Sequence, residues 1–187
     1  EMAEALRGRG LDVHLFQRSD RLLPPFGAAV GDRVASTLAA HEVTVHTDTS
    51  VDAILGDDRV EAVRADGRTV PVELAIVGVG IEPATAVTDG TAVEYGPRGA
   101  IRTDRYGETA EPGVYAAGDC AASRHAVTGE ETWIPLGLTA NRAGRAVGAT
   151  VAGDPTPVGD VAGTAVVKAF EMAEALRGRG LDVHLFQ

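Results

Sequence analysis

The strongest chemical signal in the sequence is a short apolar run that ends in a glycine and an aspartate. Residues Val114–Ala117 form the run, and Gly118 and Asp119 follow it directly. A strand that ends in this way places a carboxylate at the carboxyl edge of a sheet, where open α/β folds bind their ligands. Gly118 allows a ligand to approach the backbone closely, and Asp119 can accept hydrogen bonds from ribityl or ribose hydroxyls. A turn or helix N-cap is the alternative role for Asp119.

Two further stretches are apolar or loop segments interrupted by glycine and proline. Ala75–Pro83 is an apolar strand that breaks into a loop, and Trp133–Arg145 is a loop that opens a helix. Their order and spacing around the sequence VYAAGD are similar to those of the FAD- and NAD(P)-dependent pyridine nucleotide-disulfide oxidoreductases. The run His125–Gly129, followed by WIPLGLTANRAGR, resembles the coenzyme A-disulfide reductase and NADH oxidase branch of this family. The resemblance covers roughly Glu1–Phe170.

The resemblance implies a flavin site built from two segments of the chain. Gly118 and Asp119 would lie at the ribityl chain of FAD. The backbone N–H groups of Leu138, Thr139 and Ala140 would face the pyrimidine end of the isoalloxazine ring. A helix N-terminus at that place favours the negative charge of a reduced flavin, because its unpaired N–H groups and its dipole stabilise an anion.

The resemblance also implies a site for a nicotinamide nucleotide. The loop Gly78-Val79-Gly80 would connect the nicotinamide domain with the flavin domain, although such glycines also occur in ordinary tight turns. Glu1–Asp20 resembles the stretch that follows the dinucleotide fingerprint, a helix and then the second strand. That strand usually ends in an acid that binds the adenosine ribose of NADH, but here the position is Gln17, followed by Arg18. Arg18 can pair with a 2′-phosphate, unless it is only a solvated loop charge. We therefore expect NADPH in preference to NADH.

Several parts of the family pattern do not occur within the chain. No GxGxxG loop lies between residues 1 and 187, and Cys120, the single cysteine, does not match the redox-active position. The resemblance implies that both glycine-rich loops and the redox cysteine would precede Glu1, and that a dimerisation domain would follow Phe170. A single cysteine excludes an internal disulfide, and we interpret Cys120 as a small buried residue. We therefore assign no catalytic residue.

The composition argues against nucleic-acid and membrane partners. The formal net charge is −10, and lysine and arginine form no cluster. Apolar runs such as Leu74–Val79 are far too short to span a bilayer. The five histidines show no spacing typical of metal ligands, so we expect no metal and place His125 and the others on the surface or in loops. We expect a cytoplasmic protein.

The first seventeen residues of the chain, Glu1–Gln17, recur without a change as Glu171–Gln187. An old duplication would have drifted at solvent-facing positions, so the identity predicts a chain assembled from overlapping sequence ends, in which neither terminus need be natural. Each copy has the pattern of a helix followed by a strand. A Rossmann-like sheet has one place for that pair, and we expect the N-terminal copy to occupy it. No glycine lies between Thr164 and Glu171, so no phosphate-binding loop precedes the second copy.

The spacing of apolar residues predicts alternating helices and strands, followed by an antiparallel meander. Asp66-Gly67 between two alternating runs is a strong hairpin signal, because both turn residues take positive φ. After an N-cap at Thr139, a helix is expected to run through Val151. The remaining expected elements are helices at Glu1–Leu6, Asp32–His41 and Glu171–Leu176, and strands at Leu11–Phe16, Val43–His46, Val51–Leu55, Val60–Ala65, Thr69–Val72, Leu74–Val79, Val114–Ala117, Val161–Ala169 and Leu181–Phe186.

These patterns predict an α/β fold. It would consist of a partial Rossmann-like nicotinamide domain with an antiparallel β-meander, followed by the C-terminal part of an FAD-binding domain. The expected segments are residues 1–80 and 81–160 for these two parts, residues 161–170 for the start of a truncated dimerisation region, and residues 171–187 for the repeat.

The expected function is that of a fragment of a flavoprotein oxidoreductase, inactive by itself, from a homodimeric parent. The parent would pass a hydride from NAD(P)H to FAD, and electrons would go on to a small-molecule disulfide such as coenzyme A disulfide, or to oxygen. A ferredoxin-type FAD reductase, which the sequence GVGIEPAT would suit, is one alternative. A non-catalytic fragment that holds no cofactor is another.

Overall fold

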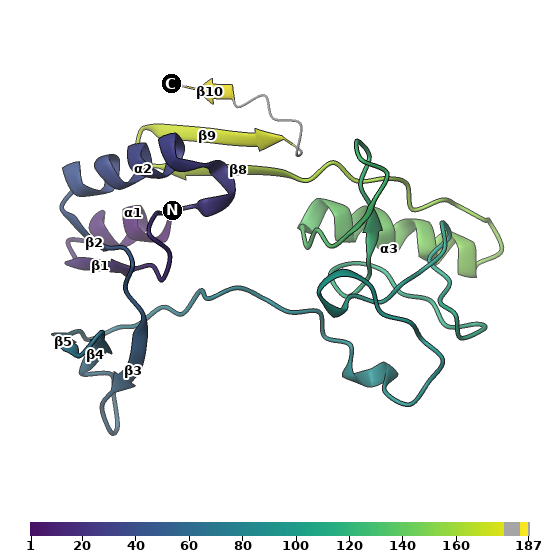
Figure 1. Ribbon diagram of the computed structural model, residues 1–187, viewed down its shortest axis with the longest axis horizontal. Helices are drawn as coiled ribbons and strands as arrows, with labels where there is room; N and C mark the ends of the chain where they lie inside the picture. The colour runs from purple at the N-terminus through teal and green to yellow at the C-terminus, as the bar shows by residue number, and fades with distance from the viewer. Residues whose placement is uncertain (178–183, 187) are drawn as a thin grey trace. The chain divides into compact units, whose positions relative to one another are not determined.

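The computed structural model describes residues 1–177 and 184–186, and it divides into two compact units. One unit is built mainly on Glu1–Gly78 and Ala165–Leu176, and the other mainly on Val79–Thr164 (Figure 1). The mixture of helices with parallel and antiparallel strands confirms the predicted α/β class.

The helices, 3-10 turns and strands follow one another in a mixed order along the chain. The helices are α1 (Met2–Arg7), α2 (Ala28–Ala40) and α3 (Gly137–Val151), and the 3-10 turns are η1 (Pro24–Phe26), η2 (Ala86–Thr88) and η3 (Pro97–Gly99). The strands are β1 (Val13–Phe16), β2 (Val43–His46), β3 (Val51–Leu55), β4 (Ala62–Ala65), β5 (Arg68–Pro71), β6 (Ser123–Arg124), β7 (Glu131–Thr132), β8 (Thr164–Ala169), β9 (Met172–Arg177) and β10 (His184–Phe186).

The first unit begins with a helix–strand–helix–strand sequence. Strands β1 and β2 are parallel, with Val13 opposite Val43. Both valines are buried, and Val34 and Leu38 of α2 join them in one core. The predicted helix and strand at the N-terminus are therefore confirmed, and α2 begins at Ala28, before the predicted Asp32. Burial of one apolar face explains why this short parallel pair holds together.

The meander predicted from alternating residues is also confirmed. Strands β3, β4 and β5 form a three-stranded antiparallel sheet in that order. At the β4–β5 turn, Asp66 has φ 46° and Gly67 has φ 72°, as a two-residue hairpin turn requires.

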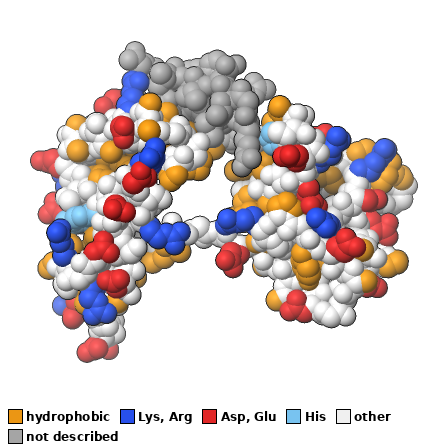
Figure 2. Space-filling view, viewed as in Figure 1, with side chains coloured by type: hydrophobic (Ala, Val, Ile, Leu, Met, Phe, Trp, Pro, Cys, Tyr) orange, Lys and Arg blue, Asp and Glu red, His pale blue; other side chains and the backbone are white. Residues whose placement is uncertain are grey.

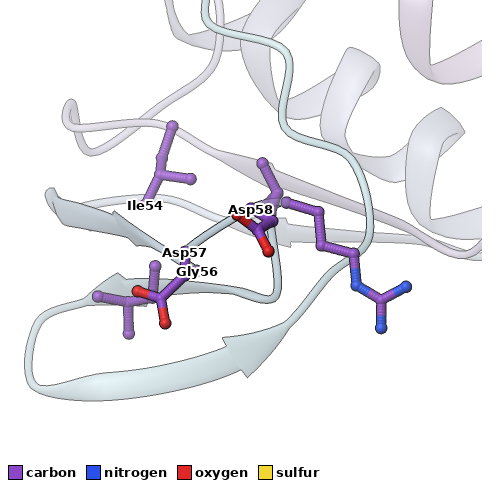
Figure 3. Close-up of a pocket in the computed structure, with 7 residues that line it drawn as sticks. Ile54, Gly56, Asp57 and Asp58 are labelled. Carbon is purple, nitrogen blue, oxygen red and sulfur yellow. The ribbon is translucent and has the colours of Figure 1, made fainter.

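The β3–β4 turn encloses a small concavity of about 250 Å³ (Figure 3). Its lining comes from one continuous segment, and Asp57 and Asp58 lie at its tip. A Cβ atom on Gly56 would lie 1.8 Å from the carbonyl oxygen of Arg59, so the tight turn needs glycine there. The concavity is therefore a product of the turn itself, and no ion pair of these aspartates with the described residues is present.

The predicted strand Leu74–Val79 is wrong. These residues form neither helix nor strand. Their apolar side chains are largely exposed, and Val79 is 91% exposed. A strand needs a neighbour for its backbone hydrogen bonds, and among the described residues none pairs with this segment.

The second unit has a core of Val93, Ile101, Ala116 and Ala121. The predicted strand Val114–Ala117 is reduced to an isolated bridge between Tyr115 and Glu108. Loops and bridges rather than a continuous sheet therefore surround this core in the described part of the chain.

Two predicted boundaries in this part of the chain are wrong. Helix α3 begins at Gly137, with Leu136 in the extended conformation of an N-cap, so Thr139 lies inside the first turn rather than at the cap. The strand predicted at Val161–Ala169 is shorter and begins at Thr164.

The two copies of the repeat differ in structure. In the first copy, Met2–Arg7 is helix α1; in the second, the same six residues form strand β9, which lies between β8 and β10. The predicted helix Glu171–Leu176 is therefore wrong. The predicted strand Leu181–Phe186 is described only at β10, because its earlier residues lie outside the described part.

Acidic and basic side chains are interspersed over the face shown in Figure 2. Acidic residues are in excess in the sequence, which gives the net charge of −10. Among the residues described, no helix combines the length and the apolar character needed to cross a membrane.

Candidate functional site

The segment after Ala117 packs against the start of α3. Gly118 has φ +84°, and a Cβ atom there would lie 3.5 Å from the Cβ atom of Ala140 in the first turn of the helix. A side chain at Gly118 would therefore be both strained and in contact with α3. The structure thus brings together the two segments that the sequence assigned to the flavin.

Asp119 is held through its backbone, which leaves its carboxylate available. The indole Nε1–H of Trp133 donates a hydrogen bond to the carbonyl oxygen of Asp119 at 2.7 Å. The guanidinium of Arg98 lies over the Trp133 ring, 5.8 Å from its centroid. Asp119 is exposed, and its carboxylate has no hydrogen bond or ion pair with the described residues.

Sequence reasoning did not single out Trp133 or Arg98. The available signal was a single tryptophan fourteen positions after Asp119, in the loop that opens α3. A buried or half-buried indole usually finds a partner for its N–H, which here is a carbonyl of the site.

The first turn of α3 presents free backbone donors. The N–H of Ala140 donates to the carbonyl of Leu136 at 2.9 Å, so it closes the first bond of the helix. The N–H groups of Leu138 and Thr139 lie before that bond and have no partner by helix geometry. Of the three predicted N–H groups, these two therefore remain available to a ligand. The Leu138 side chain, 89% exposed, lies at the same place.

A groove of about 620 Å³ runs along α3 from this point. It is lined on the helix by Leu138, Asn141, Arg142, Arg145 and Ala146, and on the facing loop by Thr156, Pro157 and Val158. Arg142 donates through Nη2 to the carbonyl of Asp160 at 2.8 Å, which ties the loop to the helix.

Cys120 is half-buried, so its predicted full burial is wrong. Its thiol lies 3.4 Å from the carbonyl oxygen of Ala117, in hydrogen-bonding geometry. The backbone of Cys120 also accepts a hydrogen bond from the N–H of Ile101 at 2.8 Å. These contacts hold the turn after Gly118 in place.

His125 is expected on the surface or in a loop; it lies outside the named strands, directly before a turn, but it is not on the surface. His125 is only 6% exposed, and its Nδ1 accepts a hydrogen bond from the N–H of Thr128 at 3.2 Å. The turn after His125 is therefore closed by a hydrogen bond to the His125 ring. The spacing of polar residues in the sequence does not predict this bond. Within the described residues, no group of three or more potential ligands could hold a metal ion.

The predicted nucleotide-selecting residues lie at the end of β1. Gln17 continues the pairing of β1 with β2, because its N–H donates to the carbonyl of His46 at 2.8 Å. The Gln17 side chain donates through Nε2 to the carbonyl of Arg21 at 3.4 Å. This bond uses the amide nitrogen and leaves the amide oxygen able to accept another hydrogen bond. Arg18 is exposed and makes no ion pair with the described residues.

Nearby Arg21 behaves differently from Arg18. Its Nη2 lies 2.6 Å from the carboxylate of Asp20, and this guanidinium lowers the pKa of Asp20. Arg21 is therefore already neutralised, and Arg18 is the cation available at this end of β1.

Gly78, Val79 and Gly80 lie in the exposed segment where one unit gives way to the other along the chain. Gly80 has φ +102°, and a Cβ atom on either glycine would meet nothing within 4 Å. The structure therefore supplies no contact that assigns these three residues a role, and their place at a nicotinamide nucleotide stays a prediction.

Comparison with known proteins agrees with this arrangement. Residues 1–147 match the pyridine nucleotide-disulphide oxidoreductase family. The chain belongs to this family. The match includes both the end of β1 and the Gly118–Ala140 contact.

A curated relative supports the same family assignment. A CoA-dependent NAD(P)H sulfur oxidoreductase of Pyrococcus furiosus is 36% identical over 92% of this chain, which corresponds to 39% of that protein. The chain therefore spans about two-fifths of the length of this curated relative.

Solved structures are similar over nearly the whole chain. An FAD-dependent pyridine nucleotide-disulphide oxidoreductase from Desulfovibrio vulgaris has a TM-score of 0.87 and 32% identity, with 95% of this chain and 46% of that chain covered. An engineered water-forming NADPH oxidase bound to NADPH, a mutant of LbNOX, has a TM-score of 0.86 and 27% identity, with 95% and 39% covered.

Proposed function

We propose that the chain is part of a flavoprotein oxidoreductase in which a hydride passes from NAD(P)H to FAD. The observation that carries the proposal is the contact of Gly118 with the first turn of α3, beside the exposed carboxylate of Asp119. The FAD-dependent enzyme from Desulfovibrio vulgaris, similar over 95% of this chain, supports FAD as the cofactor. When bound, FAD supplies the two-electron chemistry between the nucleotide and the acceptor.

The described residues fit the ribityl and pyrimidine parts of a flavin. Asp119 would accept hydrogen bonds from ribityl hydroxyls, since its carboxylate is not used by the protein. The N–H groups of Leu138 and Thr139 would point at the pyrimidine carbonyl, where the helix N-terminus stabilises negative charge. Gly118 would keep this approach open, because any side chain there would meet Ala140.

The end of β1 supports NADPH as the preferred nucleotide. The engineered NADPH oxidase carries three consecutive changes, Asp→Ala, Ala→Arg and Met→Ser. The chain has Gln17, Arg18 and Ser19 in a row. Here too, arginine and serine follow a residue that is not acidic. Arg18 would pair with the 2′-phosphate of NADPH, since it has no carboxylate partner among the described residues.

The proposed acceptor is either a sulfur compound linked to coenzyme A or oxygen. The relative from Pyrococcus furiosus is named a CoA-dependent sulfur oxidoreductase, and the engineered oxidase is named as water-forming. Two electrons suffice to reduce one disulfide to two thiols. Cys120 would not take part in this step, because it does not match the family's redox-active position.

We further propose that residues 1–80 serve the nicotinamide nucleotide and residues 81–160 the flavin. In that arrangement Gly78-Val79-Gly80 would connect the two functions, and residues 161–170 would begin a region that pairs two subunits of a homodimer. By itself the chain would bind cofactor without turnover.

Flavin retention tests the proposal directly. The purified chain is incubated with FAD and passed over a gel-filtration column, and the visible absorbance of the protein peak is recorded. We expect yellow protein. A colourless peak, combined with no FAD binding in equilibrium dialysis, would refute a flavin site in this chain.

A further inference from the structure

The two copies of the repeat lie next to the same core. Copy 1 (Glu1–Gln17) contributes the buried residues Ala3 and Val13, and copy 2 (Glu171–Gln187) contributes Met172, which is 6% exposed in the same cluster. The Thr37 hydroxyl on α2 lies 3.8 Å from the sulfur of Met172. Copy 2 therefore enters the first unit where copy 1 is already packed.

Copy 1 is fastened by polar contacts as well as by burial. Arg7 donates through Nε to the carbonyl of His41 at 3.1 Å and pairs with Glu42. Glu4 accepts hydrogen bonds from Lys168 at 2.8 Å and from the N–H of Phe170 at 2.9 Å. Each of these side chains of copy 1 has an identical counterpart in copy 2. The surface formed by α2, β2 and the end of β8, here called the repeat slot, therefore recognises residues that both copies possess.

The chain reaches copy 2 directly beside this slot. Phe170, the residue before copy 2, bonds to Glu4 of copy 1, and the next residue, Glu171, lies 3.4 Å from His41. A tether this short keeps the effective concentration of copy 2 at the slot high.

The strand conformation of copy 2 depends on a strained turn. Phe170 has φ 55°, a left-handed conformation that is unfavourable for a bulky residue. The residues of β9 are all good helix formers, and a helix of six residues is stable only through its packing. Packing in the repeat slot makes these residues helical in copy 1, so the same packing would make them helical in copy 2.

We propose that copy 2 of the same chain competes with copy 1 for the repeat slot, so that the first unit exchanges between two arrangements. In the second arrangement residues 172–177 form the helix and residues 184–186 form the strand parallel to β2. Strand β8, the new helix and the new strand then follow one another along the chain as strand, helix and strand. Copy 1 is released, and the left-handed turn at Phe170 is no longer needed.

Disulfide trapping tests the exchange in the full chain. In a Cys120→Ala background, the pair Thr44→Cys with His14→Cys reports the observed arrangement, because these positions are register partners on β2 and β1. The pair Thr44→Cys with His184→Cys reports the proposed one. The pair Thr69→Cys with His184→Cys, with Thr69 on the exposed edge of the meander, measures random collision.

We expect both Thr44 pairs to form disulfides within one chain, with the Thr44–His184 pair about tenfold or more faster than the Thr69–His184 pair. Equal rates for those two pairs would overturn the proposal. Disulfides between chains, seen as dimers on a non-reducing gel, would also overturn it, because the occupant would then come from a second molecule.

A second set of variants keeps the proposal testable without cysteines. Leu15→Asp places a charge at a position of copy 1 that packs against the core, and Leu185→Asp is the same change at the matching position of copy 2. With exchange, each single variant keeps a cooperative urea transition, and the double variant loses it for the first unit. If Leu15→Asp alone removes the transition as completely as the double variant, copy 2 does not replace copy 1.

Discussion

The Nδ1 atom of His14 lies 3.0 Å from the Nε2 atom of His46, across the parallel pair β1 and β2. The ring centroids are 5.3 Å apart and the planes are inclined by only 10°, so the two nitrogens point at each other along the line between the rings. Phe16 stacks on His46 with centroids 4.6 Å apart. Such a contact holds when at least one imidazole is neutral and fails when both carry a proton.

The first prediction is that stability falls at mildly acidic pH. Burial, then His14 and then Arg68 of β5, lower the pKa of His46 below the ordinary histidine value of 6.5. Side chains of α2 that pack against β2 in this core are apolar. Because the unfolded chain binds a proton that the folded chain does not, the free energy of unfolding decreases as pH falls from above 6.5 through the lowered pKa.

Urea unfolding followed by circular dichroism at pH 8 and at pH 5.5 measures this effect. His46→Gln is the matched control, because it removes the titrating group. In this variant the urea midpoint should change less between pH 8 and pH 5.5 than in the wild type. A wild-type midpoint that rises on acidification would contradict the prediction.

The second prediction concerns Asp119. Asp119→Asn keeps the size of the side chain but removes the charge that strengthens hydrogen bonds to ribityl hydroxyls, a loss of about 1.5–3 kcal/mol. FAD affinity in equilibrium dialysis should fall by roughly tenfold to a hundredfold. Asp89→Asn, also at an exposed position of the second unit, should leave it unchanged. Equal affinities for wild type and Asp119→Asn would remove Asp119 from the flavin site.

The third prediction concerns the choice of nucleotide. Arg18→Ala should weaken NADPH binding by about tenfold or more through loss of a charge-assisted pair with the 2′-phosphate, with little effect on NADH. Gln17→Glu should favour NADH, because it adds an acceptor for the ribose and repels the phosphate. Calorimetric titration with both nucleotides gives the ratio of affinities, and Arg33→Ala on the exposed face of α2 is the control. If Gln17→Glu leaves the ratio of NADPH to NADH affinity unchanged, Gln17 does not lie at the ribose of the nucleotide.

The fourth prediction separates two costs of adding a methyl group. Gly113 has φ +78° and open space around it, so Gly113→Ala should cost about 1–2 kcal/mol from the left-handed backbone alone. Gly107 has φ +88°, and a Cβ there would lie 2.3 Å from Cγ2 of Val147 on α3. Gly107→Ala should therefore cost roughly 2–5 kcal/mol, because overpacking adds to the same backbone term. Denaturant unfolding of both variants gives the difference, and equal losses would mean that α3 shifts freely.

Local rules predicted the elements that depend on local chemistry. The turn at Asp66-Gly67 and the register around it follow from residues that tolerate positive φ. The proximity of Gly118 to the helix α3 is expected from the order of Gly118 and Asp119 and their distance from the loop that opens α3, whereas their role at a flavin stays a prediction. The contact of Gly118 with Ala140 is a property of the fold and required the structure.

The wrong predictions concern segments whose conformation depends on contacts with other parts of the chain. Leu74–Val79 is apolar and strand-like in sequence, yet a strand exists only if another strand pairs with it. The six residues of α1 and β9 are identical, so no rule applied to them alone could separate helix from strand. His125 is buried by a turn that its own ring completes, and a spacing rule for metal ligands says nothing about that.

The hydrogen bond from Trp133 to Asp119 gives the protein an internal optical reporter. Trp133 is the single tryptophan of the chain, and its indole lies 2.7 Å from the backbone of the residue assigned to the flavin. The tryptophan fluorescence of the protein therefore comes from one place in the molecule. A flavin absorbs in the blue and near ultraviolet, so a bound isoalloxazine would quench this emission by energy transfer. The site can thus be followed by light from its own side chain, without a label.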